Sequence, residues 1–147
     1  MSVSNSLRRL LGIRELQEEQ SKLALESAIG ELHRLELALQ TSFERGRRGR
    51  NLIHASAQSG QLTDRLAGLE ETRAVKLHVA ALEPRVDAKA EEIEELRNAY
   101  LSKRVERRQA EAQIQESEAR EAVEADRRGQ QSIDDWHNLR KFRDSGE

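Results

Sequence analysis

The sequence predicts an all-α protein, a long antiparallel two-helix coiled-coil hairpin with an overhanging C-terminal helical arm. Charged residues make up 35% of the 147 residues and aromatic residues only 3%, which favours long solvated helices over a compact core. Twelve residues also recur at alternating steps of four and three, a spacing that returns to one helix face every seven residues. We name these twelve the seam: Val75, Val79, Leu82, Val86, Lys89, Ile93, Leu96, Tyr100, Lys103, Arg107, Ala110 and Ile114.

The first helix is predicted over residues 6–45. Asn5 or Ser6 can cap it, since a short polar side chain accepts hydrogen bonds from free backbone amides. Gly12 and Gly30 weaken it by up to about 1 kcal/mol each without breaking it. Its most regular apolar spacing, with Ile29 and Phe43 beside it, is formed by Leu25, Ala28, Leu32, Leu35 and Leu39.

A turn is predicted over residues 46–60, where three glycines, two serines and an asparagine interrupt the apolar spacing. The glycines do not match a phosphate-binding loop, which needs a Gly-Lys-Ser/Thr ending. A short polar connection between two helices favours antiparallel neighbours. With its midpoint near Ile53, Leu39 should face Leu66 and Leu7 should face Tyr100.

The second helix is predicted over residues 61–142. Leu62, Leu66 and Leu69 are expected to begin its contact with the first helix, followed by a slip of phase before Val75. We interpret Pro84 as a kink in a continuous helix, with a break as the alternative, because proline removes a backbone hydrogen bond.

The arm is predicted from the change in the seam beyond Tyr100. Polar residues, Lys103 and Arg107, enter the seam near the point where the first helix should end. Residues 103–128 are therefore expected to be helical and mobile unless docked. Next, Ile133, Trp136, Leu139 and Phe142 follow at steps of three and carry two of the chain's four aromatic residues. They indicate a binding surface, unless the end folds back or dimerisation buries them.

Catalytic, metal and cofactor sites are not expected. The chain has no cysteine, and His33, His54, His78 and His137 do not have a metal-ligand spacing. The acidic residues of 91–95 point several ways on a helix and form a solvated face. No nucleophile–base pair is recognisable, so an enzyme is the least expected class.

Charge and hydropathy give no strong preference for nucleic acid or membrane. The net charge is −2, and no run approaches the ~20 apolar residues of a membrane span, so a cytoplasmic location is expected. Arg45, Arg47, Arg48 and Arg50 are the one strong basic cluster. With only Phe43 nearby, protein contact or a solvated turn is favoured over nucleic-acid binding, which remains a third hypothesis.

In layout and length the chain resembles the flagellar FliJ family, small coiled-coil proteins of bacterial type III export; the type III virulence stalk proteins are similar. The resemblance is carried by residues 10–19 (LLGIRELQEE), 100–108 (YLSKRVERR) and the acidic-aromatic stretch 132–136 (SIDDW).

This resemblance implies a non-enzymatic stalk at the inner face of the cell membrane that serves motility. Its partners would be a hexameric export ATPase, a membrane-embedded export gate and export chaperones. The implied ATPase contacts are Arg8, Arg9, Ile133, Trp136, Leu139 and Phe142, and the implied gate contacts are Leu39, Phe43, Arg47, Arg48 and Arg50. The alternative function is a homodimeric coiled-coil scaffold without an ATPase partner.

Overall fold

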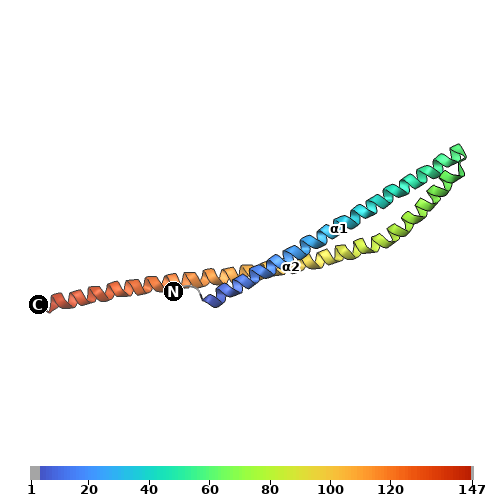
Figure 1. Cartoon of the computed structure of the whole chain (residues 1–147). Coiled ribbons are helices and arrows are strands. Elements are labelled where there is room, and N and C mark those ends of the chain that lie inside the picture. Colours follow the sequence, from blue (N-terminus) through green and yellow to red (C-terminus); the bar gives the residue numbers. More distant parts are fainter. Residues whose placement is uncertain (1–3, 147) are drawn as a thin grey trace. The chain divides into compact units, whose positions relative to one another are not determined.

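The computed structural model describes residues 4–146, which form two long α-helices packed against each other (Figure 1). Helix α1 spans Asn5–Ser59 and helix α2 spans Leu62–Ser145. No strand occurs within residues 4–146. The predicted all-α class and the predicted pair of long helices are confirmed.

Local capping sets the ends of the two helices. The Ser4 hydroxyl accepts hydrogen bonds from the amides of Ser6 and Leu7, so Ser4, rather than Asn5 or Ser6, caps α1. At the other end Gly60 has a φ of 72° and donates its amide to the Ser56 carbonyl at 2.8 Å. This left-handed conformation is easily adopted by glycine and ends the helix.

The predicted turn over residues 46–60 is wrong, because α1 continues to Ser59 and the connection is only Gly60 and Gln61. Gly46 and Gly49 are buried and continue the contact face that contains Ala28. Gly49 lies against Gly68 of α2 so closely that a Cβ atom on Gly68 would stand 2.7 Å from the Gly49 carbonyl oxygen. These glycines therefore serve close helix packing rather than chain reversal.

Contacts divide the helices into two compact units, Gln20–Leu101 and Met1–Glu19 with Ser102–Glu147. In the first unit, Gly46 lies against Val75, not against the residue near position 60 that the predicted pairing requires. The predicted register is wrong because the turn lies at Gly60 instead of near Ile53.

The seam prediction is confirmed residue by residue, since all twelve positions are buried or partly buried. However, the seam continues backwards from Val75 to the buried Gly68 without a slip of phase. Leu62, Leu66 and Leu69 are 67%, 55% and 49% exposed, so the prediction that they contact α1 is wrong.

Helix α2 runs through Pro84 without interruption and ends at Ser145. The continuous-helix interpretation is therefore confirmed, and residues 133–142 belong to the same helix. None of the helices formed by the described residues is long and apolar enough to cross a lipid bilayer.

In the second unit, the start of α1 contacts α2 through ion pairs. Arg14 pairs with Glu106 at 3.0 Å, and Arg107 pairs with both Glu18 and Glu111. Lys103 also approaches Glu106 at 3.4 Å. The prediction that the polar seam positions begin where the first helix ends is therefore wrong. Arg107, one of these positions, pairs with a carboxylate that α1 supplies, Glu18.

Candidate partner-binding surfaces

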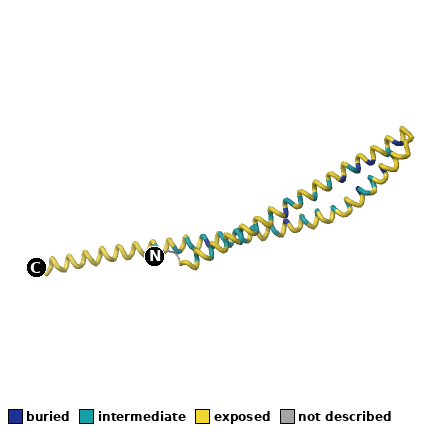
Figure 2. Tube along the Cα trace, in the orientation of Figure 1, coloured by how far each residue is buried: buried dark blue, intermediate teal, exposed yellow. Residues whose placement is uncertain are grey.

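The last part of α2, residues 122–145, is helical, and every one of its side chains is exposed (Figure 2). We name it the terminal segment. Ile133, Trp136, Leu139 and Phe142 are 54%, 57%, 65% and 77% exposed. These are large apolar side chains on a predominantly polar helix, so the segment can gain free energy by contact with another protein.

The four apolar side chains at steps of three wind around the axis of the terminal segment. Each residue turns about 100° along an α-helix, so each step of three falls about 60° short of a full turn. Ile133 and Phe142, the outer two, therefore point to opposite sides. The Arg140 guanidinium stands 5.3 Å from the centre of the Trp136 ring, within cation–π range. A shallow hollow beside this pair is lined by Trp136, Leu139, Arg140 and Arg143.

Arg8 and Arg9 are exposed on α1, but the structure does not bring them to the terminal aromatic residues. Arg14 pairs with Glu106, which sets Arg8 beside a part of α2 roughly 20 residues before Ile133. At 1.5 Å per residue the separation is roughly 30 Å. The family resemblance grouped these residues, because it implied that both ends of the chain contact the ATPase.

All five predicted gate residues lie on α1, including Arg47, Arg48 and Arg50, which were predicted to lie in the turn. Phe43 is 51% exposed, and its spacing to Arg47 and Arg50 places the three on one exposed face. Arg48 is exposed on another side of the helix, whereas Leu39 is partly buried on the face that packs against α2. Three of the five predicted residues therefore form a common surface.

Arg45, the remaining arginine of the basic cluster at residues 45–50, forms an ion pair with α2. Its guanidinium donates to Glu71 at 2.6 Å, which raises the pKa of Arg45. The same hydrogen bond lowers the pKa of Glu71. The pair fixes α1 against α2 and leaves Arg45 less available to an outside partner than Arg47 or Arg50.

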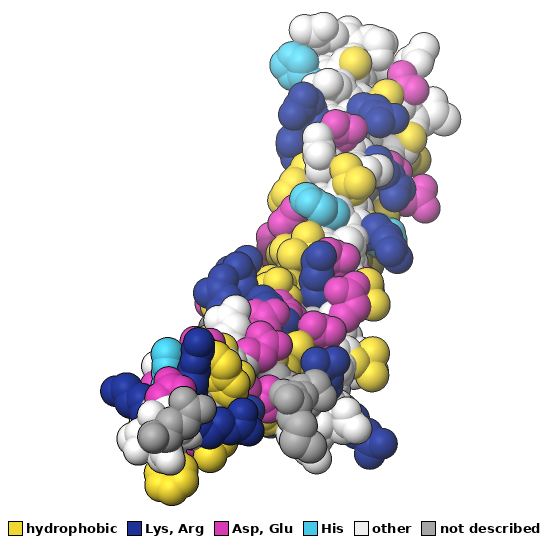
Figure 3. All heavy atoms as spheres, turned by 90° about the vertical axis from the view of Figure 1, so that its left-hand side faces the viewer, with side chains coloured by type: hydrophobic (Ala, Val, Ile, Leu, Met, Phe, Trp, Pro, Cys, Tyr) yellow, Lys and Arg dark blue, Asp and Glu magenta, His cyan; other side chains and the backbone are white. Residues whose placement is uncertain are grey.

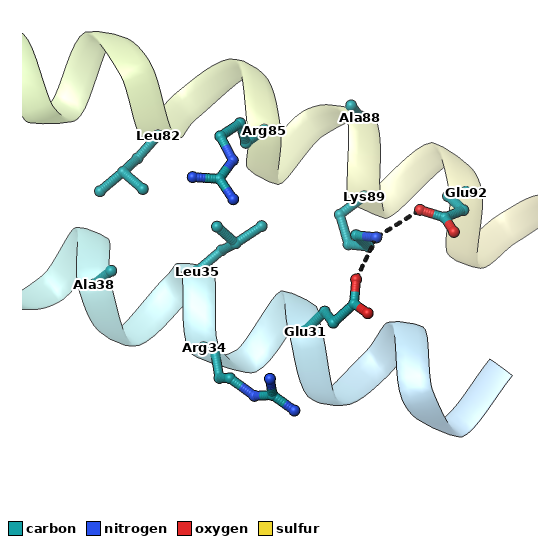
Figure 4. Close-up of a pocket in the computed structure, with 9 residues that line it drawn as sticks. All are labelled: Glu31, Arg34, Leu35, Ala38, Leu82, Arg85, Ala88, Lys89 and Glu92. Carbon is teal, nitrogen blue, oxygen red and sulfur yellow. Dashed lines mark hydrogen bonds and ion pairs between the residues drawn. The ribbon is translucent and has the colours of Figure 1, made fainter. Parts of the chain in front are cut away.

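The hollow shown in Figure 4 lies between the helices of the first unit, and Lys89 is one of the residues that line it. Its amine lies 2.6 Å from Glu31 and 2.7 Å from Glu92. Hydrogen bonds from the Lys89 amine to the two carboxylates raise the pKa of Lys89, and Lys89 lowers the pKa of Glu31. A lysine held in its protonated form is a poor nucleophile, so this hollow supports structure rather than covalent chemistry.

Charges of both signs are intermixed on the face drawn in Figure 3, without a broad area of one sign. Among residues 4–146, no group of three or more histidine or acidic side chains could hold a metal ion. The exposed apolar side chains described above are flanked by charges, a combination that suits protein contact.

The surface that sequence reasoning missed is the outer side of α2 near the turn, where Leu62, Leu66 and Leu69 are exposed. The available signal was Gly68, which shares its phase with Val75 and therefore with the seam. No family model, curated protein or solved structure matches the chain.

Proposed function

We propose that the two helices form an antiparallel coiled-coil hairpin and that the terminal segment is its overhanging arm. Within the first unit, Arg45 late in α1 pairs with Glu71 early in α2, and the earlier Glu31 pairs with the later Lys89. This order supports antiparallel packing. The alternating steps of four and three in the seam support a coiled coil.

We infer that this hairpin is a non-enzymatic stalk of a type III export apparatus, most simply the flagellar one. The resemblance of residues 10–19, 100–108 and 132–136 to the FliJ family motivates the inference. The observation that carries it is the terminal segment, an exposed helix in which four large apolar side chains follow one another at steps of three. A stalk requires a stiff helix that grips a partner, and it requires no catalytic group of its own.

The winding of the apolar side chains favours a partner that encircles the arm. A single packed helix touches one narrow face, which would leave either Ile133 or Phe142 outside the contact. A ring of subunits can touch side chains on opposite sides of one helix. The proposed partner is therefore the hexameric export ATPase, bound by Ile133, Trp136, Leu139 and Phe142, with Arg8 and Arg9 as a separate contact.

At the other end of the hairpin, the face of Phe43, Arg47 and Arg50 is the proposed contact for the export gate, with Leu39 and Arg48 at its margins. Such a contact would hold the protein at the inner side of the cell membrane without insertion. Escort of export chaperones belongs to the same proposed role.

The experiment measures ATP hydrolysis by the cognate export ATPase with and without this chain, together with binding of the chain to the ATPase. The wild-type chain should bind and accelerate hydrolysis. The double variant Trp136→Ala and Phe142→Ala should weaken binding at least about 30-fold, the effect of one interface residue worth about 2 kcal/mol. Its helix content should not change, because both side chains are exposed.

Phe43→Ala is the matched control, since Phe43 is also an exposed aromatic residue but lies in the other unit. It should leave ATPase binding unchanged. Equal ATPase binding by the wild-type chain and the double variant would contradict the arm assignment. A stable dimer in light scattering, with no effect on hydrolysis, would instead establish the homodimeric scaffold.

A further inference from the structure

A stripe of exposed residues runs along the outer side of α2 near the turn. It consists of Leu62, Leu66, Leu69, Arg73 and Lys76, spaced by four, three, four and three residues, and we name it the leucine stripe. We propose that the leucine stripe binds an amphipathic helix of a partner protein, with apolar side chains against the leucines and carboxylates against Arg73 and Lys76. This proposal goes beyond the export function and does not depend on it.

The first argument is that burial is inverted at this position of α2. Gly68 is buried against α1, whereas Leu66 and Leu69 on either side are 55% and 49% exposed. A helix pair stabilised only by its own contacts would turn its leucines inward, because removing a leucine side chain from water is favourable. Leu66 and Leu69 are therefore available for contact with another protein.

Close packing prevents α2 from rotating to bury the leucines itself. The Gly68 position approaches the backbone of both Gly49 and Ile53. A rotation that brought Leu66 or Leu69 to this position would place a large side chain where even one carbon atom is too close. The inward side is thus fixed by glycine, and the leucines are held on the outer side.

The second argument is charge complementarity. Leu66, Leu69, Glu70, Thr72, Arg73 and Lys76 line a shallow hollow. Within residues 4–146, no ion pair engages Arg73 or Lys76, whereas the neighbouring Glu71 is neutralised by Arg45. Two free cations that continue the leucine spacing select a partner helix with carboxylates at the corresponding positions.

A second copy of this chain fits the leucine stripe less well. In a parallel pair, Arg73 and Lys76 would face their own copies, and like charges at the contact are destabilising. In an antiparallel pair centred on Leu66, Arg73 would extend past Leu62 toward the other copy's turn at Gly60. Neither arrangement places a carboxylate directly opposite the two cations, so a different, acidic helix is favoured.

The test uses synthetic helical peptides of three heptads and the full chain. Each peptide carries leucine at the contact positions of two heptads and glutamate at those of the third. Two versions place the glutamates at opposite ends, so that both helix directions are sampled, and matched peptides carry lysine instead. Fluorescence anisotropy should show binding of a glutamate peptide about tenfold or more tighter than of its lysine counterpart.

Variants of the chain locate the binding. The double variant Leu66→Asp and Leu69→Asp should weaken binding of the glutamate peptide at least about 30-fold. Leu37→Asp is the matched control, because Leu37 is 62% exposed on α1 outside the stripe, and it should bind as the wild type does. Arg73→Glu with Lys76→Glu should reverse the preference toward the lysine peptide, a gain that unfolding cannot produce.

Three results of the peptide experiments would overturn the proposal. They are absence of binding by both glutamate peptides, equal binding of glutamate and lysine peptides, and equal loss in the Leu37→Asp control. A chain that dimerises alone and becomes monomeric on Leu66→Asp with Leu69→Asp would also overturn it, because the stripe would then bind a second copy.

Discussion

Replacing Gly68 with alanine should destabilise the helix pair although alanine is the better helix former. The added Cβ atom would stand 2.7 Å from the Gly49 carbonyl oxygen and 2.7 Å from Cγ1 of Ile53, with the Ile53 backbone nitrogen at 3.1 Å. Ordinary contacts of a Cβ atom begin near 3.4 Å. Because two of the three neighbours are backbone atoms, the helices must separate to admit the methyl group.

The magnitude follows from two opposing effects. Overpacking of this kind costs about 1–3 kcal/mol, whereas exchange of glycine for alanine inside a helix gains up to about 1 kcal/mol. Gly68→Ala should therefore lower the free energy of unfolding by up to about 2 kcal/mol. Gly30→Ala is the control, because nothing lies within 4 Å of its Cβ position, and it should raise the free energy of unfolding by up to about 1 kcal/mol.

The assay is urea unfolding followed by far-ultraviolet circular dichroism, with the two variants compared in parallel. Since the helix-propensity gain is common to both, the difference between them measures the packing cost alone. Gly46→Ala should fall between them, because its nearest neighbour is a Val75 side-chain carbon at 3.2 Å that can move. An equal stabilisation by Gly68→Ala and Gly30→Ala would refute the close-packing argument.

Two further predictions concern proline and pH. Pro84→Ala should raise the free energy of unfolding by up to about 3 kcal/mol in the same assay, because α2 continues through Pro84 and alanine restores a backbone hydrogen bond; a decrease would contradict this. The pKa values of Glu31 and Glu71 are held below the ordinary 4.5 by hydrogen bonds from Lys89 and Arg45. The contribution of these two carboxylates to folding stability is therefore complete above pH 4.5 and is lost as the pH falls through the lowered pKa values. The thermal midpoint of unfolding should drop over that pH range. Glu71→Gln should reduce that drop, and an unchanged pH profile would argue against the Arg45–Glu71 pair.

The seam could be predicted from the sequence because regular apolar spacing in a highly charged chain is typical of helices that pack along one face. The turn could not be located, because glycine serves both chain reversal and close helix approach, and composition does not separate these uses. Gly46 and Gly49 continue the spacing of the α1 contact face, whereas Gly60 does not. Phase, rather than the density of glycines, distinguishes the turn from the packed positions.

Only some of the exposed surfaces could be predicted, because residue type alone does not identify the inner face of a helix. Trp136 and Phe142 were correctly expected to be exposed, because no apolar spacing of α1 extends to them. Leu62, Leu66 and Leu69 were assigned to the inner side because leucine is ordinarily the residue that coiled coils bury. The phase of Gly68 with the seam and its contact with Gly49 reveal that small residues take that place here.

The ion pairs between α1 and α2 also limit how the protein can change in length. If α2 slid by one heptad, Lys89 would leave Glu31 and meet Ala24 or Ala38, and Glu71 would leave Arg45 and meet Leu52 or Ala38. A partly covered charge that loses its partner is costly, so the helices resist sliding. Insertions and deletions in the paired region are therefore tolerated only when both helices change together by matching whole heptads. Homologous chains should therefore differ in length by matching seven-residue insertions or deletions in both helices.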